Sequence, residues 1–171
     1  MRPRHFGIAG YKNAGKTTLV VDLVRELVAR GWRVGTVKHA HHDFDIDHPG
    51  KDSQRHRAAG AVEVIVASGR RVAHIQELAG SPEPALDELV GRMTGVDLVL
   101  VEGWKSGVHP RLEVRRSAAP APAIATTASG VRAIVSDVAL SGESLPVFSR
   151  DDVPAIADFI LQSLGLPGSP P

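Results

Sequence analysis

Near the start of the chain, the hydrophobic pattern changes from a short apolar run, typical of a strand, to the spacing of a helix. A short apolar run at residues 6–9 leads into a turn at Gly10, and the apolar side chains of residues 19–28 then recur at helical spacing. Gly31 is suited to end this helix in a left-handed cap, and residues 32–37 alternate like a second strand. The pattern predicts a strand, a helix and a strand, which together form a βαβ unit.

The later periodic segments predict further strands and helices. The connection at Ser68-Gly69 is so short that the strands on either side of it can pair only antiparallel. Residues 96–101 form the most continuous apolar run, which is typical of an interior strand. The predicted segments are a helix at 52–59, strands at 62–67 and 70–75, a helix from Ser81 to about Met93, strands at 96–101, 112–114 and 131–135, and a helix at 154–164.

This alternation of strands and helices predicts an α/β fold of the P-loop NTPase type. We expect three layers and a mostly parallel sheet with an antiparallel addition. The length of 171 residues favours a single nucleotide-binding domain, which we place at residues 1–164. Residues 165–171 contain three prolines and two glycines, so we expect a flexible tail there.

Composition excludes several classes of function. The 20 Lys and Arg residues nearly balance the 19 Asp and Glu residues, so no large field attracts nucleic acid or an anionic membrane. No apolar run approaches the roughly 20 residues of a membrane-spanning helix. The absence of cysteine excludes disulfides, thiolate metal sites and a cysteine nucleophile. We therefore expect a cytoplasmic protein without nucleic-acid or membrane partners.

The most specific motif is a phosphate-binding loop of the Walker A pattern, G-x-x-x-x-G-K-T. It lies where its mechanism requires, between the first predicted strand and the helix that follows. The glycines let backbone N–H groups surround phosphates, Lys16 reaches the β- and γ-phosphate oxygens, the Thr17 hydroxyl ligates Mg²⁺, and Thr18 lies near the α-phosphate. The loop comprises Gly10, Tyr11, Lys12, Asn13, Ala14, Gly15, Lys16 and Thr17.

A phosphate-binding loop needs a second acidic group for its metal ion, and the strand at residues 96–101 offers two. Asp97 and Glu102 lie at its two ends. Ligands of open α/β sheets bind beyond the carboxyl ends of the strands, so we expect Glu102 to be the metal ligand. Asp97 is expected to cap the opposite end of the strand.

Residues 39–52 are rich in histidine and aspartate and permit two interpretations. Imidazole and carboxylate groups together could store or deliver Zn²⁺ or Ni²⁺. Alternatively, the loop senses the γ-phosphate and Mg²⁺ as a switch, with Asp45 or Asp47 holding metal-bound water, and we prefer this interpretation. The residues that suggest metal binding are His39, His41, His42, Asp43, Asp45, Asp47, His48, Asp52 and His56.

Three stretches of the sequence resemble one known family. They are the phosphate loop, residues 36–42 with 47–53, and Leu98-Val-Leu-Val-Glu-Gly-Trp-Lys105. Together they resemble the molybdopterin-guanine dinucleotide biosynthesis protein B (MobB) family, and the match covers residues 5–115 by motif.

This resemblance implies a GTP-binding P-loop protein, usually dimeric, with weak hydrolysis. Such a protein assists attachment of GMP to molybdopterin alongside the nucleotidyltransferase MobA. The resemblance maps Glu102 to the acidic group of the Mg²⁺ site, and Lys12 stands one position later than the extra lysine of dimeric, deviant-loop ATPases. The nucleotide-loop positions are Gly10, Asn13, Gly15, Lys16, Thr17 and Thr18.

Two other functions remain open from the sequence. One is a nickel or zinc delivery GTPase, and the other is a P-loop kinase or ligase acting on a small molecule. The second would need a base for in-line transfer, and no residue is identified as that base. Guanine recognition is not indicated by an Asn-Lys-x-Asp element, and Asp137, which follows a predicted strand, is the candidate for reading the base.

Overall fold

A computed structural model describes residues 3–40, 44–104, 106–126 and 129–170. The chain divides into two compact units. One contains the described residues of 1–39 and 86–171, and the other contains those of 40–85. Among the described residues, no helix combines the length and apolar character needed to cross a membrane.

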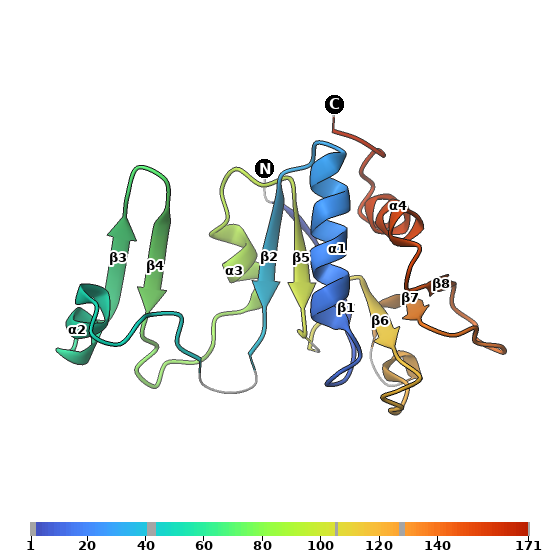
Figure 1. The fold of residues 1–171 in the computed structure, drawn as a ribbon, viewed down its shortest axis with the longest axis horizontal. Coiled ribbons are helices and arrows are strands. Elements are labelled where there is room, and N and C mark those ends of the chain that lie inside the picture. The colour runs from blue at the N-terminus through green and yellow to red at the C-terminus, as the bar shows by residue number, and fades with distance from the viewer. Residues whose placement is uncertain (1–2, 41–43, 105, 127–128, 171) are drawn as a thin grey trace. The chain divides into compact units, whose positions relative to one another are not determined.

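The larger unit is built on a six-stranded sheet in which every pair of neighbours is parallel (Figure 1). The strand order is β2-β5-β1-β6-β7-β8, so β5 and β1 are interior neighbours. Its elements are β1 (Arg4–Ala9), α1 (Lys16–Ala29), β2 (Val34–Lys38), α3 (Leu86–Gly91), β5 (Leu98–Glu102), β6 (Arg111–Arg115), a short 3₁₀ helix (Ile124–Thr126), β7 (Val131–Ser136), β8 (Val147–Ser149) and α4 (Val153–Ser163).

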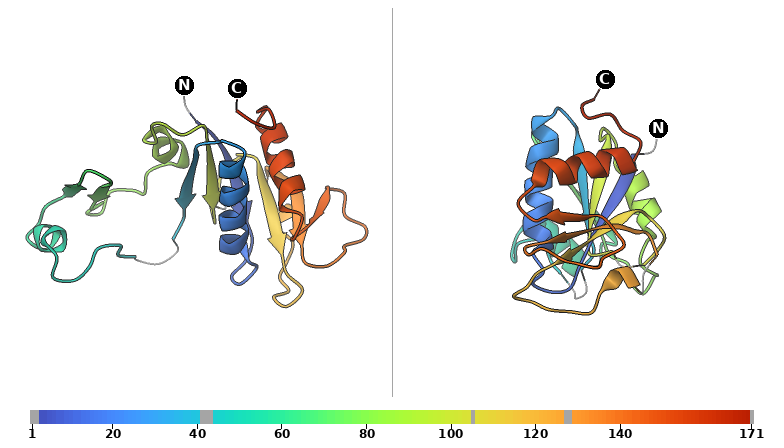
Figure 2. Two further views of the ribbon diagram at one scale, coloured as in Figure 1. Left: turned by 45° about the horizontal axis from the view of Figure 1, so that its top comes forward. Right: turned by 90° about the vertical axis from the view of Figure 1, so that its right-hand side faces the viewer.

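Helices cover both faces of this sheet, which confirms the predicted three layers. On one face Phe6 and Ile8 pack with α1 and α4, and on the other Val99 and Val101 pack with α3. Figure 2 (right) shows α1 and α3 on opposite sides of the strands. All five residues of β5 are buried, as expected of an interior parallel strand.

Local sequence explains where these helices begin and end. The α1 helix begins directly after Gly15, whose φ of 91° is left-handed, and its apolar residues recur on one face. The α4 helix begins after Asp152, whose side chain accepts a hydrogen bond from the backbone N–H of Ala155, and Pro154 occupies its first turn. Leu166, beyond the end of α4, still packs against the core.

The smaller unit contains α2 (Asp52–Ala58) and an antiparallel pair, β3 (Glu63–Ala67) and β4 (Val72–Gln76). The pairing confirms the prediction made from the short connection. The two strands form a sheet of their own and do not extend the parallel sheet. Ile65 and Val72 share a face of this hairpin, because side chains alternate along each strand, and both are mostly exposed.

The predicted elements are present, with differences at their ends. The helix predicted from Ser81 is shorter and begins at Leu86, beyond Pro82 and Pro84. Strand β8 was not predicted, because three residues at a sheet edge carry too little alternation to be recognised. A single domain over residues 1–164 stays a prediction, since two compact units can belong to one domain.

Candidate functional site

Three strands of the larger unit end together at one edge of the sheet. In the parallel register, Glu102 at the end of β5 lies opposite Ile8 of β1 and Lys38 of β2. The glycine-rich loop leaves β1 at this same edge and enters α1. The carboxyl edge of the sheet and the N-terminus of a helix therefore meet, as in the ligand sites of open α/β sheets.

The glycine-rich loop turns sharply between β1 and α1 through residues with positive backbone φ angles. Gly10, Asn13 and Gly15 all have positive φ angles, of 156°, 65° and 91°. A side chain at Gly10 would place its Cβ 2.8 Å from the carbonyl oxygen of Val114, so only glycine fits there. The first turn of α1 contains no acidic residue, which leaves its positive end available to an anion.

Lys16 begins α1 and reaches back over this loop. Its Nζ donates a hydrogen bond of 2.7 Å to the backbone carbonyl oxygen of Tyr11, and both residues lie at the exposed end of the site. The ammonium group is thus held at the loop by a contact that a phosphate oxygen could replace. The role of Lys16 at the β- and γ-phosphates stays a prediction.

Thr17 and Glu102 form the centre of the site. The Thr17 hydroxyl donates a hydrogen bond of 2.6 Å to Oε1 of Glu102, and Nζ of Lys38 lies 3.5 Å from the same oxygen. Glu102 is only 8% exposed. A hydroxyl and a carboxylate at a helix N-terminus are oxygen donors of the kind that Mg²⁺ takes, so these two residues fit the predicted metal site.

Asp97 lies at the opposite end of β5 and takes no part in this site. Its carboxylate pairs with the Arg33 guanidinium at 2.6 Å and also accepts the backbone N–H of Arg33 at 2.9 Å. These contacts with Arg33 hold the pKa of Asp97 below its ordinary value. Asp97 therefore joins the beginnings of β2 and β5, in the place that the strand direction predicted.

A hollow beside the phosphate loop contains both Thr18 and Asp137. Asp137 accepts hydrogen bonds from the backbone N–H of Ser117 at 2.8 Å and from its hydroxyl at 2.9 Å. These bonds lower the pKa of Asp137, and the bond from the backbone N–H of Ser117 has the larger effect. The hollow is lined by Ala14, Gly15, Thr18, Arg115, Arg116, Asp137 and Arg150.

Sequence reasoning missed the three arginines of this hollow. Arg115 and Arg116 lie beyond the strand predicted at 112–114, and Arg150 follows β8, which was not predicted. The signal that could have found Arg115 and Arg116 is the charged pair at the carboxyl end of a strand.

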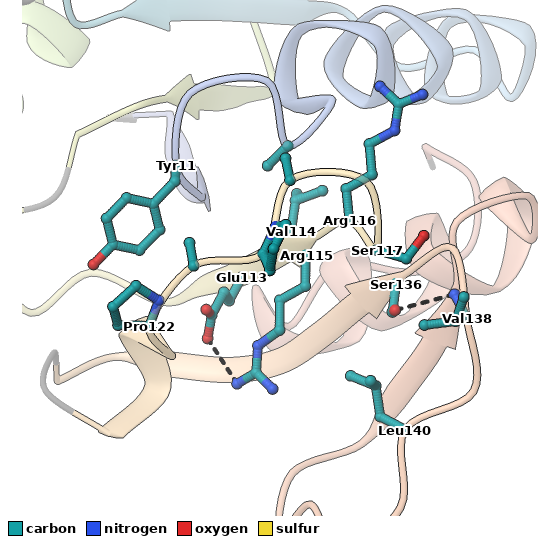
Figure 3. Close-up of a pocket in the computed structure, with 14 residues that line it drawn as sticks. Tyr11, Glu113, Val114, Arg115, Arg116, Ser117, Pro122, Ser136, Val138 and Leu140 are labelled. Atoms are coloured by element: carbon teal, nitrogen blue, oxygen red, sulfur yellow. Dashed lines mark hydrogen bonds and ion pairs between the residues drawn. The ribbon is translucent and has the colours of Figure 1, made fainter.

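A second pocket adjoins the first and is lined by Tyr11 and Pro122 among others (Figure 3). Glu113 at its floor is 1% exposed, pairs with Arg115 at 3.0 Å, and accepts the backbone N–H groups of Ile124 and Ala125. Through these bonds Glu113 holds the 3₁₀ helix in place. The carboxylate therefore shapes the pocket wall.

Asp45 and Asp47 lie in the smaller unit, and their carboxylates contact other residues of that unit. Both carboxylates pair with Arg57, at 2.9 and 3.4 Å, and Asp47 also accepts the Ser53 hydroxyl at 2.8 Å. The pKa of Asp45 is lowered, chiefly by Arg57. The part of the chain that the structure describes contains no group of three His, Asp or Glu side chains arranged to hold a metal ion. His41, His42 and Asp43 lie outside the described residues.

The arrangement of these parts identifies the class of protein. A parallel sheet whose first strand leads through a glycine-rich loop into a helix, beside a strand that ends in an acid, defines an α/β fold of the P-loop type.

Comparison with known proteins identifies the family. The profile of the family "Molybdopterin guanine dinucleotide synthesis protein B" (MobB) matches residues 5–137. The molybdopterin-guanine dinucleotide biosynthesis adapter protein of Escherichia coli is 40% identical over 157 residues, covering 90% of this chain and 89% of that protein. The adapter protein of Haemophilus influenzae is 38% identical, covering 90% and 85%. The chain therefore belongs to the MobB family, and the prediction made from its motifs is confirmed.

Solved structures agree with this assignment. The crystal structure of a MobB protein homolog from Bacillus stearothermophilus has a TM-score of 0.69 and 28% identity, and covers 94% of this chain and 97% of that one. A structure of Bacillus subtilis MobB has a TM-score of 0.75 at 23% identity, with 94% and 98% covered, and shows the shared fold.

Proposed function

We propose that this chain is a GTP-binding adapter, with weak Mg²⁺-dependent GTPase activity at most, in molybdenum cofactor biosynthesis. In this role it assists attachment of GMP to molybdopterin to form molybdopterin guanine dinucleotide. The observation that carries the nucleotide part is the 2.6 Å contact between Thr17 and Glu102, at the N-terminus of the helix that follows the glycine-rich loop. The adapter role is supported by the names of the relatives in Escherichia coli and Haemophilus influenzae.

The residues of the loop would act on the nucleotide through charge and backbone donors. Backbone N–H groups between Gly10 and Gly15 would bind phosphate oxygens, and Lys16 would exchange its contact with the Tyr11 carbonyl for one with the β- and γ-phosphates. Thr17 and Glu102 would hold Mg²⁺, which offsets the negative charge of the phosphates when it is bound. We assign no catalytic base, and weak turnover stays a prediction.

Asp137 is the candidate for reading the guanine base. A carboxylate can accept hydrogen bonds from two adjacent N–H groups, and the edge of guanine presents such a pair. Asp137 shares its hollow with Thr18, which we place near the α-phosphate. Arg116 and Arg150 line the same hollow and suit an anionic ligand.

The proposal includes a homodimer. The β3–β4 hairpin is a two-stranded sheet, which is marginally stable alone, and it exposes 64% of Ile65 and 67% of Val72 on one face. We infer that a second copy of the chain covers this face. The guanylyltransferase MobA and molybdopterin are the further partners, and a cytoplasmic location without nucleic-acid or membrane partners stays a prediction.

Among the residues that the structure describes, no specific contact supports the metal-delivery or kinase alternative. Asp45 and Asp47 are joined to Arg57, and their role as ligands of metal-bound water stays a prediction.

A reconstituted reaction tests the proposal. Molybdopterin, GTP, Mg²⁺ and MobA are mixed with and without this chain, and formation of the dinucleotide is followed by mass spectrometry. We expect the wild-type chain to increase the yield, and the Lys16→Ala variant to lose this effect. An equal yield without the chain would contradict the adapter role.

A further inference from the structure

Lys38 and Glu102 end two neighbouring strands at the same level of the sheet. They are partners in the parallel register of β2 and β5. The backbone N–H of His39 donates to the carbonyl oxygen of Glu102 at 2.9 Å, so pairing continues one residue beyond the end of β2. The backbone of Lys38 is therefore fixed at the carboxyl edge of the sheet, beside the predicted Mg²⁺ ligand.

The side chains of Lys38 and Glu102 differ in their freedom to move. The Lys38 side chain is 62% exposed, whereas that of Glu102 is 10% exposed. The ammonium group lies 3.5 Å from Oε1 of Glu102, which already accepts the 2.6 Å hydrogen bond from Thr17. The lysine end of this pair is exposed, so water can solvate the ammonium group when it moves away, whereas the buried Glu102 carboxylate needs another cation in its place.

We propose that Lys38 binds the terminal phosphate of a nucleoside triphosphate and thereby makes the site prefer triphosphate over diphosphate. In the nucleotide-free protein its ammonium group rests on Glu102, and in the complex it turns to the γ-phosphate. This inference rests on the proposed binding of nucleotide with Mg²⁺ at Thr17 and Glu102.

The charges at this edge explain why the lysine would change partners. Once a divalent cation is bound, the Glu102 carboxylate no longer needs a second cation, and the ammonium group experiences repulsion from the metal. The terminal phosphate of a triphosphate offers a new anion, which a diphosphate lacks. Lys16 comes from α1 and Lys38 comes from β2, so the two ammonium groups would approach the phosphates from different elements.

The test compares the affinities for a non-hydrolysable GTP analogue and for GDP, both with Mg²⁺, by calorimetry. Lys38→Gln removes a charge-assisted hydrogen bond to the terminal phosphate, so we expect it to weaken analogue binding by at least about tenfold. GDP binding should change by less than about twofold, because the terminal phosphate is missing. Lys38→Arg, which keeps the charge, should retain most of the preference.

Arg33→Gln is the matched control. It removes one cation from an ion pair between the same two strands, at their opposite end, where Arg33 contacts Asp97 at 2.6 Å. We expect it to leave both affinities unchanged. Far-ultraviolet circular dichroism and the unfolding temperature confirm that each variant is folded.

Two results would overturn the inference. Lys38→Gln that weakens the analogue and GDP equally would make Lys38 a general structural residue, and unchanged affinities would remove it from the site. Failure of the proposed function gives a different result, since the wild-type chain would then bind neither nucleotide.

Discussion

The Thr17 hydroxyl donates a 2.6 Å hydrogen bond to Oε1 of Glu102, although 85 positions separate the two residues in the sequence. The strand order explains the contact, because β5 lies beside β1 and both strands end at the edge where α1 begins. The fold thus brings the Thr17 hydroxyl of the phosphate loop next to the Glu102 carboxylate at the end of β5. This pair is the centre of the proposed Mg²⁺ site.

The two acids of β5 should differ in their effect on nucleotide binding. We expect Glu102→Gln to lower the affinity for GTP in the presence of Mg²⁺ by more than about tenfold, since each factor of ten corresponds to about 1.4 kcal/mol. Asp97→Asn should leave this affinity unchanged, because Asp97 contacts Arg33 at the far end of the strand. Calorimetry with Mg²⁺ and with EDTA measures both affinities. A larger effect of Asp97→Asn would show that the metal site does not lie at the Glu102 end of β5.

The hairpin should hold two copies of the chain together. Ile65→Glu with Val72→Glu places two charges on the exposed face of β3 and β4 and should convert the dimer to a monomer. Sedimentation velocity measures the change. Val28→Glu is a suitable control, because Val28 is 54% exposed on α1 in the other unit. A wild-type chain that sediments as a monomer would remove the dimer from the proposal.

Gly7 of β1 lies where the side chains of His109 and Arg111 leave no room for a Cβ. A Cβ at this position would lie 2.7 Å from Nε2 of His109 and 2.8 Å from Cβ of Arg111. We expect Gly7→Ala to lower the free energy of unfolding by about 1 to 3 kcal/mol, as overpacking does. Urea denaturation measures it, with Gly69→Ala as control, since nothing lies within 4 Å of a Cβ there. Equal effects would show that the sheet can adjust around the added methyl group.

His109 should make stability depend on pH. Burial, and then the charge of Arg111, lowers the pKa of His109 to about 4. The unfolded chain binds this proton at a pKa of about 6.5, so the unfolded state is favoured as pH falls from about 6.5 towards 4. The stabilising contribution of the neutral ring is complete above this window.

We therefore expect the wild-type chain to lose about 2 kcal/mol more than His109→Gln between about pH 7.5 and pH 5. Urea denaturation at both pH values measures this difference. Parallel pH dependence in the two proteins would contradict the assigned pKa.

Much of the site could be predicted because its residues belong to motifs whose position in the fold is fixed. The loop from Gly10 to Thr17 follows a strand and begins a helix, and the direction of β5 distinguishes Glu102 from Asp97. Both inferences use only local sequence and the rule that ligands bind at the carboxyl edge of a parallel sheet.

Other contacts could not be predicted because they depend on the strand order. The approach of Lys38 to Glu102 requires β2 to lie beside β5, and no local pattern states which strands are neighbours. The pairing of Asp45 and Asp47 with Arg57 is also a tertiary contact, and it gives these carboxylates a partner inside the smaller unit.

Titration of the chain with GTP tests the central claim most directly. Calorimetry is performed on the wild type with and without Mg²⁺ and on Lys16→Ala, which removes the cation that contacts the Tyr11 carbonyl. We expect Mg²⁺-dependent binding in the wild type and none in the variant, whose circular dichroism should be unchanged because Lys16 lies outside the hydrophobic core. Equal affinity in the two proteins, or a wild type that does not bind GTP, would contradict the assignment of this loop as the nucleotide site.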